Sequence, residues 1–324
     1  MILITGINGE MGSALIKKLS QTEKKEIIGL DIKSVNSEIE SCLNKAYVGD
    51  IRDKDLIKKI FSDNKITEVY HLAAILSSKA ETIPFLSHQI NVDGFLNLIS
   101  EINASENLVK FFFASSIAVY CLSDDNNNAA ITEDEFCNPN NMYGCNKLYC
   151  EKLGAYFSNY SKLINNLDFR SLRFSGIISA YTLPHGGTSD YAPEMIHKAI
   201  KNENYTCFVN SESCIPFMVM PDAIRAITSL MNTEKKYLTK DVYHIQAFNP
   251  NVKNIYKKLK KYFPEFKLDY EINKQRQELI DSWPSNLDQK AAEKDWNWIP
   301  KYNFDNAFDK YLIPKIKEHY NNKS

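Results

Sequence analysis

The sequence has no surplus of charge of either sign. Its 324 residues include 39 Lys and Arg against 40 Asp and Glu, which gives a formal net charge of −1. Nucleic-acid binders carry a basic patch, and clusters of basic residues also mark proteins that bind anionic membranes. We therefore expect neither a nucleic acid nor a membrane among the partners.

Cysteines are few: the chain has 7, an odd number at irregular spacings. Disulfide frameworks use even numbers of cysteines, and zinc sites repeat short Cys or His spacings. Cys145 and Cys150 are too far apart for such a loop, and no histidine pair accompanies them. We expect reduced thiols, no disulfide and no metal.

Long hydrophobic runs are missing as well. The apolar stretch at 111–122 is interrupted by Ser115 and Ser116 and falls short of the ~20 residues that span a bilayer. The apolar start of the chain lacks the basic segment and cleavage site of a secretory signal. The expectation is a cytoplasmic protein without a transmembrane helix.

Strand and helix patterns alternate through the first half of the chain. Short apolar runs typical of buried strands are each followed by apolar residues at helical spacing. This alternation predicts an α/β fold with a doubly wound parallel sheet. The predicted strands are 1–5, 26–30, 46–48, 68–72, 109–114 and 169–174, and the predicted helices are 11–19, 53–61, 84–104 and 143–160.

Beyond about residue 175 the pattern becomes irregular, with a loop to Asp190, a helix near Met195 and short strands at 205–209 and 242–245. We expect residues 1–175 to form a dinucleotide-binding (Rossmann) domain. Residues 176–324 should form mainly a substrate-binding lobe, with some segments returning to the first sheet.

The first strand runs into three glycines, and a helix follows at once. A strand, a tight turn and a helix N-terminus form the context in which free N–H groups and the helix dipole bind a pyrophosphate. Gly6 permits the turn, Gly9 the close approach of the cofactor, and Gly12 the packing of helix on strand. The cofactor-binding residues predicted here are Gly6, Asn8, Gly9, Glu10, Met11 and Gly12.

Asp31 stands at the predicted end of the second strand. A carboxylate there accepts hydrogen bonds from ribose hydroxyls and repels a 2′-phosphate, which favours NAD over NADP. Asp50 either borders the adenine or caps the helix that starts near Asp53. Further cofactor contacts are predicted at Ile32, Ile51, Leu72, Ala73 and Ala74.

Tyr143 and Lys147 are four residues apart in a predicted helix, which places them on one face. Ser116 lies just past an apolar strand, at the carboxyl edge where parallel sheets bind ligands. Oxidation of an alcohol needs a base, and a phenol of ordinary pKa ~10 is too weakly ionised at neutral pH to act as one. Because a nearby ammonium favours the phenolate, these three residues predict an alcohol-oxidising site.

The first-half motifs resemble those of the extended short-chain dehydrogenases/reductases. They are T-G-x-x-G-x-x-G from Thr5, H-L-A-A from His71, N-V-D-G from Asn91, S-S-I-A-V-Y from Ser115 and Y-G-x-x-K from Tyr143. The resemblance adds Asn91, Tyr143, Lys147 and Ile177 to the cofactor contacts. It also implies a homodimer formed through helices that include Tyr143.

The second half resembles the short-chain type of L-threonine 3-dehydrogenase, in segments 171–179, 183–192, 216–223 and 281–288. The resemblance implies a metal-independent enzyme of threonine catabolism that oxidises the β-hydroxyl of L-threonine with NAD to 2-amino-3-ketobutyrate. Tyr143 would be the base, Ser116 would orient the hydroxyl, and Lys147 would lower the pKa of the phenol. The implied substrate residues are Ser77, Ser116, Tyr143, Thr188, Ser189 and Trp283.

Several of these interpretations have alternatives. Trp283 is equally explained as a core residue, Ser77 as a loop cap, and Asp190 as a helix cap rather than an ammonium ligand. The chain departs from the family at three positions: Ser175 replaces an expected proline, His185 a glycine and Cys121 a glycine. His185 is either a polar group at the pocket mouth or a surface residue.

Two other functions compete with the first. One is a nucleotide-sugar epimerase or dehydratase of the same superfamily, although dehydratases are expected to carry an Asp-Glu pair where Ile117 and Ala118 stand. The other is a non-catalytic regulator that senses NAD. That reading predicts loss of Tyr143 or Lys147, and both are present.

Overall fold

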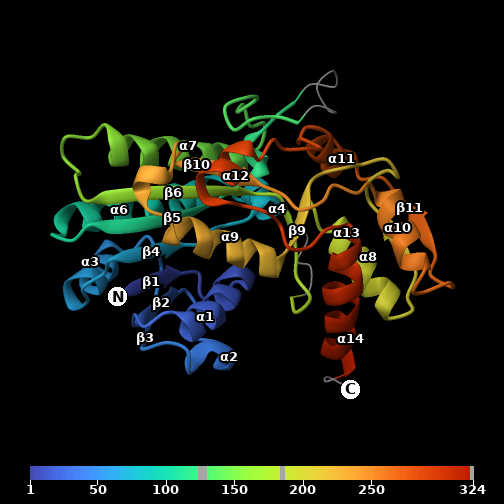
Figure 1. Cartoon of the computed structure of the whole chain (residues 1–324), viewed down its shortest axis with the longest axis horizontal. Coiled ribbons are helices and arrows are strands. Elements are labelled where there is room, and N and C mark those ends of the chain that lie inside the picture. Colours follow the sequence, from blue (N-terminus) through green and yellow to red (C-terminus); the bar gives the residue numbers. More distant parts are fainter. Residues whose placement is uncertain (123–129, 183–186, 322–324) are drawn as a thin grey trace.

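In the computed structural model, residues 1–122, 130–182 and 187–321 are described. A seven-stranded sheet with the order β10-β6-β5-β4-β1-β2-β3 forms its centre, and every strand pair in it is parallel (Figure 1). This confirms the predicted fold class. The strands are β1 (Ile2–Thr5), β2 (Ile27–Asp31), β3 (Lys45–Val48), β4 (Glu68–His71), β5 (Val109–Ser116), β6 (Leu167–Phe174) and β10 (Val242–Ile245).

Helices cover both faces of this sheet, which explains why β5 has three consecutive phenylalanines: each side chain meets a covered face. On one face lie α1 (Glu10–Thr22), α2 (Ser37–Glu40), α9 (Met220–Asn232) and α12 (Lys290–Trp296). On the other lie α3 (Lys54–Asp63), α6 (Gly94–Ala104) and α7 (Met142–Asn159). The predicted helix 84–104 consists of α5 (Pro84–His88), a π turn (Gln89–Asp93) and α6.

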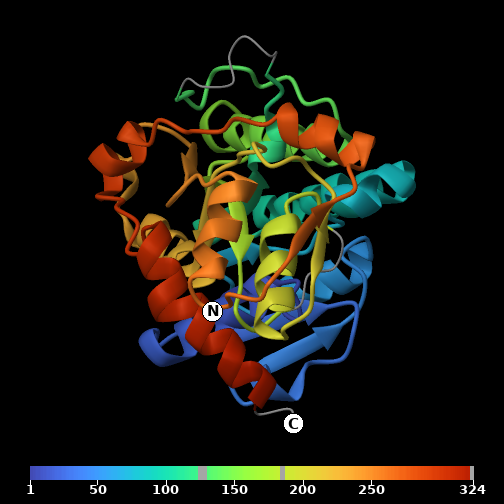
Figure 2. The ribbon, with the colours of Figure 1, turned by 90° about the vertical axis from the view of Figure 1, so that its right-hand side faces the viewer.

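The second half forms a smaller lobe beside the carboxyl edge of the sheet (Figure 1). It holds two two-stranded sheets and its own apolar core, and α14 runs along one side of it (Figure 2). β10, however, leaves this lobe and pairs with β6. The lobe elements are β7 (Gly176–Ile178), α8 (Tyr191–Ile200), β8 (Tyr205–Cys207), β9 (Phe217–Val219), α10 (Val252–Lys260), β11 (Leu268–Tyr270), α11 (Lys274–Asp281), α13 (Phe304–Ala307) and α14 (Ile313–Asn321).

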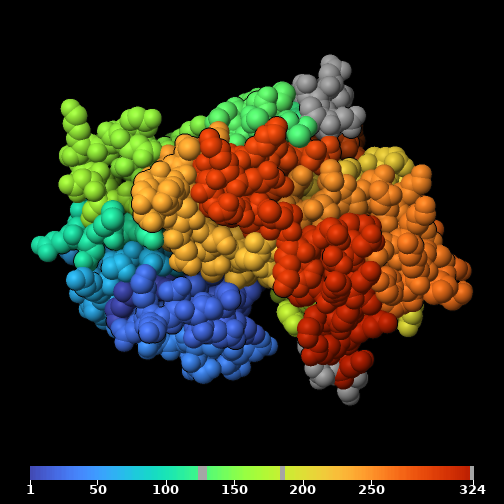
Figure 3. Space-filling view, viewed as in Figure 1, coloured from blue at the N-terminus to red at the C-terminus, as the bar shows by residue number. Residues whose placement is uncertain are grey.

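Parallel strands bring their carboxyl ends to one edge, so Thr5, Asp31, His71 and Ser116 end neighbouring strands on the side that faces the lobe. The space-filling view shows a hollow between the N-terminal residues, in blue, and α14, in red (Figure 3). Within the described ranges, no helix is long and apolar enough to cross a membrane.

Candidate active site

The glycine turn between β1 and α1 leaves no room for side chains at two of its positions. Gly6 has a φ of +75°, and a Cβ there would lie 2.7 Å from the Ala73 nitrogen. A Cβ at Gly12 would lie 2.2 Å from the Gly6 carbonyl oxygen, whereas one at Gly9 meets only that oxygen, at 3.1 Å. The bare turn leads directly into the N–H groups that begin α1 at Glu10, an arrangement that fits a pyrophosphate.

Asp31 is held beside this turn. Its Oδ2 accepts a hydrogen bond from the Asn8 backbone N–H at 2.9 Å, and its Oδ1 accepts one from the Lys33 N–H at 3.0 Å. The Asn8 side chain in turn donates to the carbonyls of Lys33 and Ser34. The predicted ribose acceptor is therefore fixed by backbone groups, while its neighbour Ile32 is 64% exposed.

Asp50 is not a helix cap. Asp53 caps α3 by accepting from the Leu56 N–H at 3.0 Å, whereas the Asp50 carboxylate pairs with the Arg52 guanidinium at 2.6 Å. The hydrogen bonds from Arg52 hold the pKa of Asp50 below its usual value. The capping alternative for Asp50 is wrong, and Ile51 beside it is buried.

The segment after β4 is tied to β1 and to the π turn. The N–H groups of Leu72 and Ala73 approach Thr5 Oγ1 at 3.2 and 3.3 Å. Asn91 bonds the backbone of Ile75 with both ends of its amide, accepting from the N–H at 2.7 Å and donating to the carbonyl at 3.0 Å. Asn91 thus shapes the loop that carries Leu72, Ala73 and Ala74.

The helix α7, which carries Tyr143, packs tightly on the turn that follows Ser116 at the end of β5. A Cβ at Gly144 would lie 2.0 Å from the Ala118 carbonyl oxygen, and Asn141, which caps α7, donates to the same oxygen at 3.2 Å. Ser116 is the last residue of β5, two residues beyond the predicted strand end, and its Oγ accepts from the Ala118 N–H at 3.1 Å.

Lys147 lies one turn along α7 from Tyr143. Its Nζ is 5.4 Å from the centre of the Tyr143 ring and 4.5 Å from that of Phe113, and it donates to the Ala114 carbonyl at 2.6 Å. Burial raises the pKa of Tyr143 above its ordinary value. Burial lowers the pKa of Lys147 to about 8, although Cys150 and Glu151 act in the opposite direction. The resting site thus holds a neutral phenol beside an ammonium.

The residues that the resemblance assigns to the substrate come together only in part. Ser77, which begins the unpredicted helix α4 (Ser77–Thr82), lies 3.3 Å from Thr188 through their hydroxyl oxygens. Ser189 follows Thr188, and Ile177 lies in β7. Trp283 is packed in the lobe core with 5% exposure, and its Nε1 has no hydrogen-bond partner among the described residues.

The three departures from the family have different settings. Ser175 is buried, and its hydroxyl has no partner among the described residues. Cys121 does not adopt the positive φ that would require glycine, so its side chain is accommodated. His185 lies outside the described residues. Asp190 stands at the start of α8 without capping it by its side chain; its carboxylate accepts from the Gly187 N–H at 2.6 Å.

Two features of the site were not foreseen. Arg276 of α11 donates to the Gly187 carbonyl and so anchors the loop that carries Thr188; nothing in the sequence around it signals this. The other is Glu10 of α1, whose side chain contacts Ser179 of the lobe. Burial raises the pKa of Glu10 to about 7, a hydrogen bond from Ser179 partly opposes that rise, and the charge of Asp190 adds to it.

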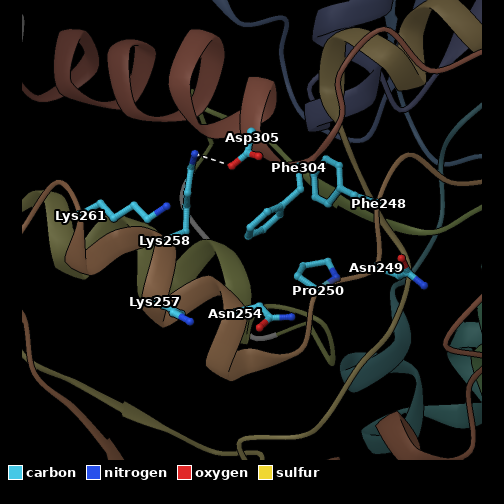
Figure 4. Close-up of a pocket in the computed structure, with 9 residues that line it drawn as sticks. All are labelled: Phe248, Asn249, Pro250, Asn254, Lys257, Lys258, Lys261, Phe304 and Asp305. Atoms are coloured by element: carbon cyan, nitrogen blue, oxygen red, sulfur yellow. Dashed lines mark hydrogen bonds and ion pairs between the residues drawn. The ribbon is translucent and has the colours of Figure 1, made fainter.

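A separate cavity of about 460 Å³ lies in the lobe, between α10 and α13 (Figure 4). The rings of Phe248 and Phe304, which contact each other, line this cavity. Lys258 lines it but is paired with Asp305 and Asp309, each at 2.7 Å. None of its lining residues belongs to the predicted cofactor or substrate set.

A bare glycine turn, a fixed acidic residue and a Tyr-Lys pair at one edge of a parallel sheet define a dinucleotide-binding α/β protein. The sequence model of the NAD dependent epimerase/dehydratase family matches residues 2–245. The chain belongs to this family of extended short-chain dehydrogenases/reductases. NAD is its cofactor, and the glycine turn fits that cofactor's pyrophosphate.

Individual relatives cover the chain almost completely. An uncharacterized epimerase/dehydratase of Staphylococcus haemolyticus (strain JCSC1435) is 31% identical over 324 residues, 99% of each chain. The mitochondrial L-threonine 3-dehydrogenase of Bos taurus is 32% identical over 308 residues, 94% of this chain and 79% of its own. The X-ray structure of L-threonine dehydrogenase from Clostridium difficile superposes with a TM-score of 0.89 at 31% identity, covering 98% of this chain and 97% of that one.

Proposed function

We propose that the chain oxidises the β-hydroxyl of L-threonine to 2-amino-3-ketobutyrate, with NAD⁺ as the oxidant. The observation that supports the proposal is the close packing of Gly144, the neighbour of Tyr143, on Ala118, two residues after Ser116, together with the Lys147 ammonium 5.4 Å from the centre of the Tyr143 ring. The names of the Bos taurus and Clostridium difficile relatives support L-threonine as the substrate.

The proposed roles follow from the chemistry of each side chain. Ser116 Oγ orients the substrate hydroxyl, and Tyr143, as phenolate, removes its proton. Burial raises the pKa of Tyr143, and an ammonium such as that of Lys147 acts in the opposite direction by favouring the phenolate. Bound NAD⁺ supplies the acceptor for the hydride that leaves the β-carbon.

Recognition of the amino acid is proposed for the Ser77 and Thr188 hydroxyls, together with Ser189. A zwitterion needs donors for its carboxylate, and the paired hydroxyls of Ser77, at the start of α4, and Thr188, next to Gly187, provide them. Trp283 would close the pocket, and its Nε1, which has no partner in the described part of the chain, would be a further donor. A homodimer through the α7 face is part of the same proposal.

The test is NADH formation by the purified protein with L-threonine, L-serine and UDP-sugars offered separately. We expect turnover with L-threonine and little with the others. Epimerisation of a UDP-sugar without turnover of L-threonine would replace this proposal by the nucleotide-sugar alternative. NAD binding without turnover of any substrate would favour the regulator.

A further inference from the structure

A chain of buried polar side chains runs from β10 to β5 beside the proposed catalytic residues. Arg173 of β6 pairs with Glu151 of α7 at two points, with Nε···Oε1 and Nη2···Oε2 distances of 2.9 and 2.6 Å. Arg173 Nη1 also donates to Tyr120 Oη at 2.8 Å, and Tyr120 Oη lies 2.8 Å from His244 Nδ1. Ser115 Oγ donates to Glu151 at the other end. None of these five residues, here called the Arg173 network, is more than 3% exposed.

Every hydrogen bond of the network has a definite direction. The Asp288 carbonyl can only accept, so His244 Nε2, 2.7 Å away, carries the proton. Burial keeps the pKa of His244 below its ordinary value, although Glu133, 3.7 Å from Nε2, acts in the opposite direction. Neutral His244 therefore accepts from the Tyr120 hydroxyl through Nδ1, and Tyr120 accepts from Arg173. The network is fully satisfied in one arrangement only.

One end of the network adjoins the proposed catalytic residues, and the other adjoins the segment that carries Trp283. Ser115 precedes Ser116, and Glu151 lies one helical turn after Lys147 on the same side of α7. Asp288, at the far end, belongs to the segment 282–288 that carries Trp283. That segment is joined to the region after β5 by the Leu122 N–H, which donates to the Ser282 carbonyl at 2.8 Å.

A gain in stability is a weak explanation for such a network. Burial removes both charges from water, and the attraction between them often does no more than offset that loss of hydration. A second buried pair on the same strand provides a comparison. Arg170 and Asp168 of β6 also form a two-point pair, but Arg170 Nη1 donates to the carbonyls of Leu230 and Thr233 at the end of α9. This pair is structural and lies toward the start of β6, away from the carboxyl edge.

We propose that Tyr120, Arg173 and Glu151 are positioning residues that fix the end of β5 against α7. They thereby hold Ser116 in place relative to Tyr143 and Lys147. Through His244 they also hold the end of β5 in place relative to the segment 282–288. The proposal rests on the proposed function for its kinetic test. It predicts that loss of one hydroxyl in this network changes catalysis more than loss of an equally buried hydroxyl elsewhere.

The test compares Tyr120→Phe with Tyr70→Phe. Tyr70 of β4 is 2% exposed and its hydroxyl donates to Glu68 at 3.1 Å, so Tyr70→Phe also removes a buried tyrosine hydroxyl, with one hydrogen bond lost where Tyr120→Phe loses two. We expect a lower melting temperature in both variants, with the larger loss in Tyr120→Phe, because Arg173 and His244 each lose one hydrogen-bond partner there. We expect kcat with L-threonine to fall about tenfold in Tyr120→Phe alone, because a shift of about 1 Å in a reacting group is costly. The KM for NAD should stay unchanged. Equal kcat values for the two variants would show that the network is only structural.

A second measurement needs no substrate. The ionisation of Tyr143 in the NAD⁺ complex can be followed by ultraviolet difference absorbance. For each protein, the spectrum of the variant that also carries Tyr143→Phe is subtracted. A displaced Lys147 no longer favours the phenolate, so the apparent pKa should rise in Tyr120→Phe and not in Tyr70→Phe. If the protein does not oxidise L-threonine, the proposed function fails while this titration still decides the positioning role; an unchanged pKa in Tyr120→Phe overturns it.

Arg173→Lys extends the comparison, because it keeps the charge and loses the two-point geometry. Its control is Arg170→Lys on the same strand. A fall in kcat in Arg173→Lys alone supports the positioning role, and an equal fall in both contradicts it.

Discussion

Gly144 and Ala118 are packed so closely that a Cβ at position 144 would lie 2.0 Å from the Ala118 carbonyl oxygen. The oxygen also accepts from Asn141, so it has little freedom to move away. This contact limits how near the start of the Tyr143 helix comes to the turn after β5.

Gly144→Ala should therefore push α7 off the turn after Ser116. We expect a loss of about 1–3 kcal/mol in the free energy of unfolding, the usual cost of overpacking. Activity should fall by about a hundredfold, because the base is displaced from the substrate hydroxyl. Denaturant unfolding and NADH formation measure the two effects.

Gly49→Ala is the matched control for that change. Its Cβ would meet the tip of the Leu56 side chain, which can rotate away, rather than a backbone oxygen. Activity close to that of the parent protein is expected here. Full activity in Gly144→Ala would contradict the role given to the packing on Ala118.

Tyr143→Phe should abolish turnover and leave NAD binding largely intact. Removal of a general base typically costs about 10²- to 10⁴-fold in rate, whereas the ring still fills its place beside Lys147. Initial rates and a fluorescence titration with NADH separate the two properties. Tyr149→Phe, on the same helix with 50% exposure, is the control and should turn over normally. A normal rate in Tyr143→Phe would refute the proposed base.

The affinity for NAD should weaken as the pH rises through about 7. Burial raises the pKa of Glu10 to about 7, so its carboxyl is neutral below that pH and negative above it. A negative carboxylate at the start of α1 repels the pyrophosphate, and one proton limits the change to about tenfold per pH unit.

Glu10→Gln should remove this dependence, because the amide stays neutral. The stability of the unliganded protein should change in step. The pKa of Glu10 is raised in the folded state, so the parent protein loses stability as the pH rises from its unfolded pKa of about 4.5 toward 7. Isothermal titration and thermal melts at several pH values test both statements. An unchanged pH profile in Glu10→Gln would exclude Glu10 as the titrating group.

Asp31→Ala should weaken NAD binding and reduce its preference over NADP. The variant removes the carboxylate that Asn8 and Lys33 hold in place, and a hydrogen bond to a charged group is worth about 1.5–3 kcal/mol. Asp53→Ala is the control: it removes the cap of α3 at a cost of about 1 kcal/mol and should leave the cofactor preference unchanged. Dissociation constants for both cofactors provide the measurement.

The features of the fold that the sequence predicts best are those that depend on residues close together in the chain. The alternation of strands and helices up to residue 174 follows from burial on two sheet faces, and the Gly6 turn from its glycines. The partner of β10 is different: residues 242–245 predict a strand, but their pairing with β6 is a contact between residues far apart in the chain.

At the site, the same distinction holds. Both Asp50 and Asp53 stand close to the start of the predicted helix, and the structure separates them: Asp53 accepts from the Leu56 N–H, whereas Asp50 pairs with Arg52. The bond between Arg276 and the Gly187 carbonyl and the contact of Glu10 with Ser179 each join residues far apart in the chain, so no local spacing predicts them.

The return of β10 to the sheet has a consequence for synthesis on the ribosome. Until Ile245 has emerged, β6 presents an open edge of unpaired N–H and C=O groups, and such edges pair readily with other chains. The nascent chain must therefore carry β7, α8, β8 and β9 of the lobe before the edge of β6 is covered, which makes this part of the lobe matter for folding of the cofactor half as well as for the proposed recognition of the substrate.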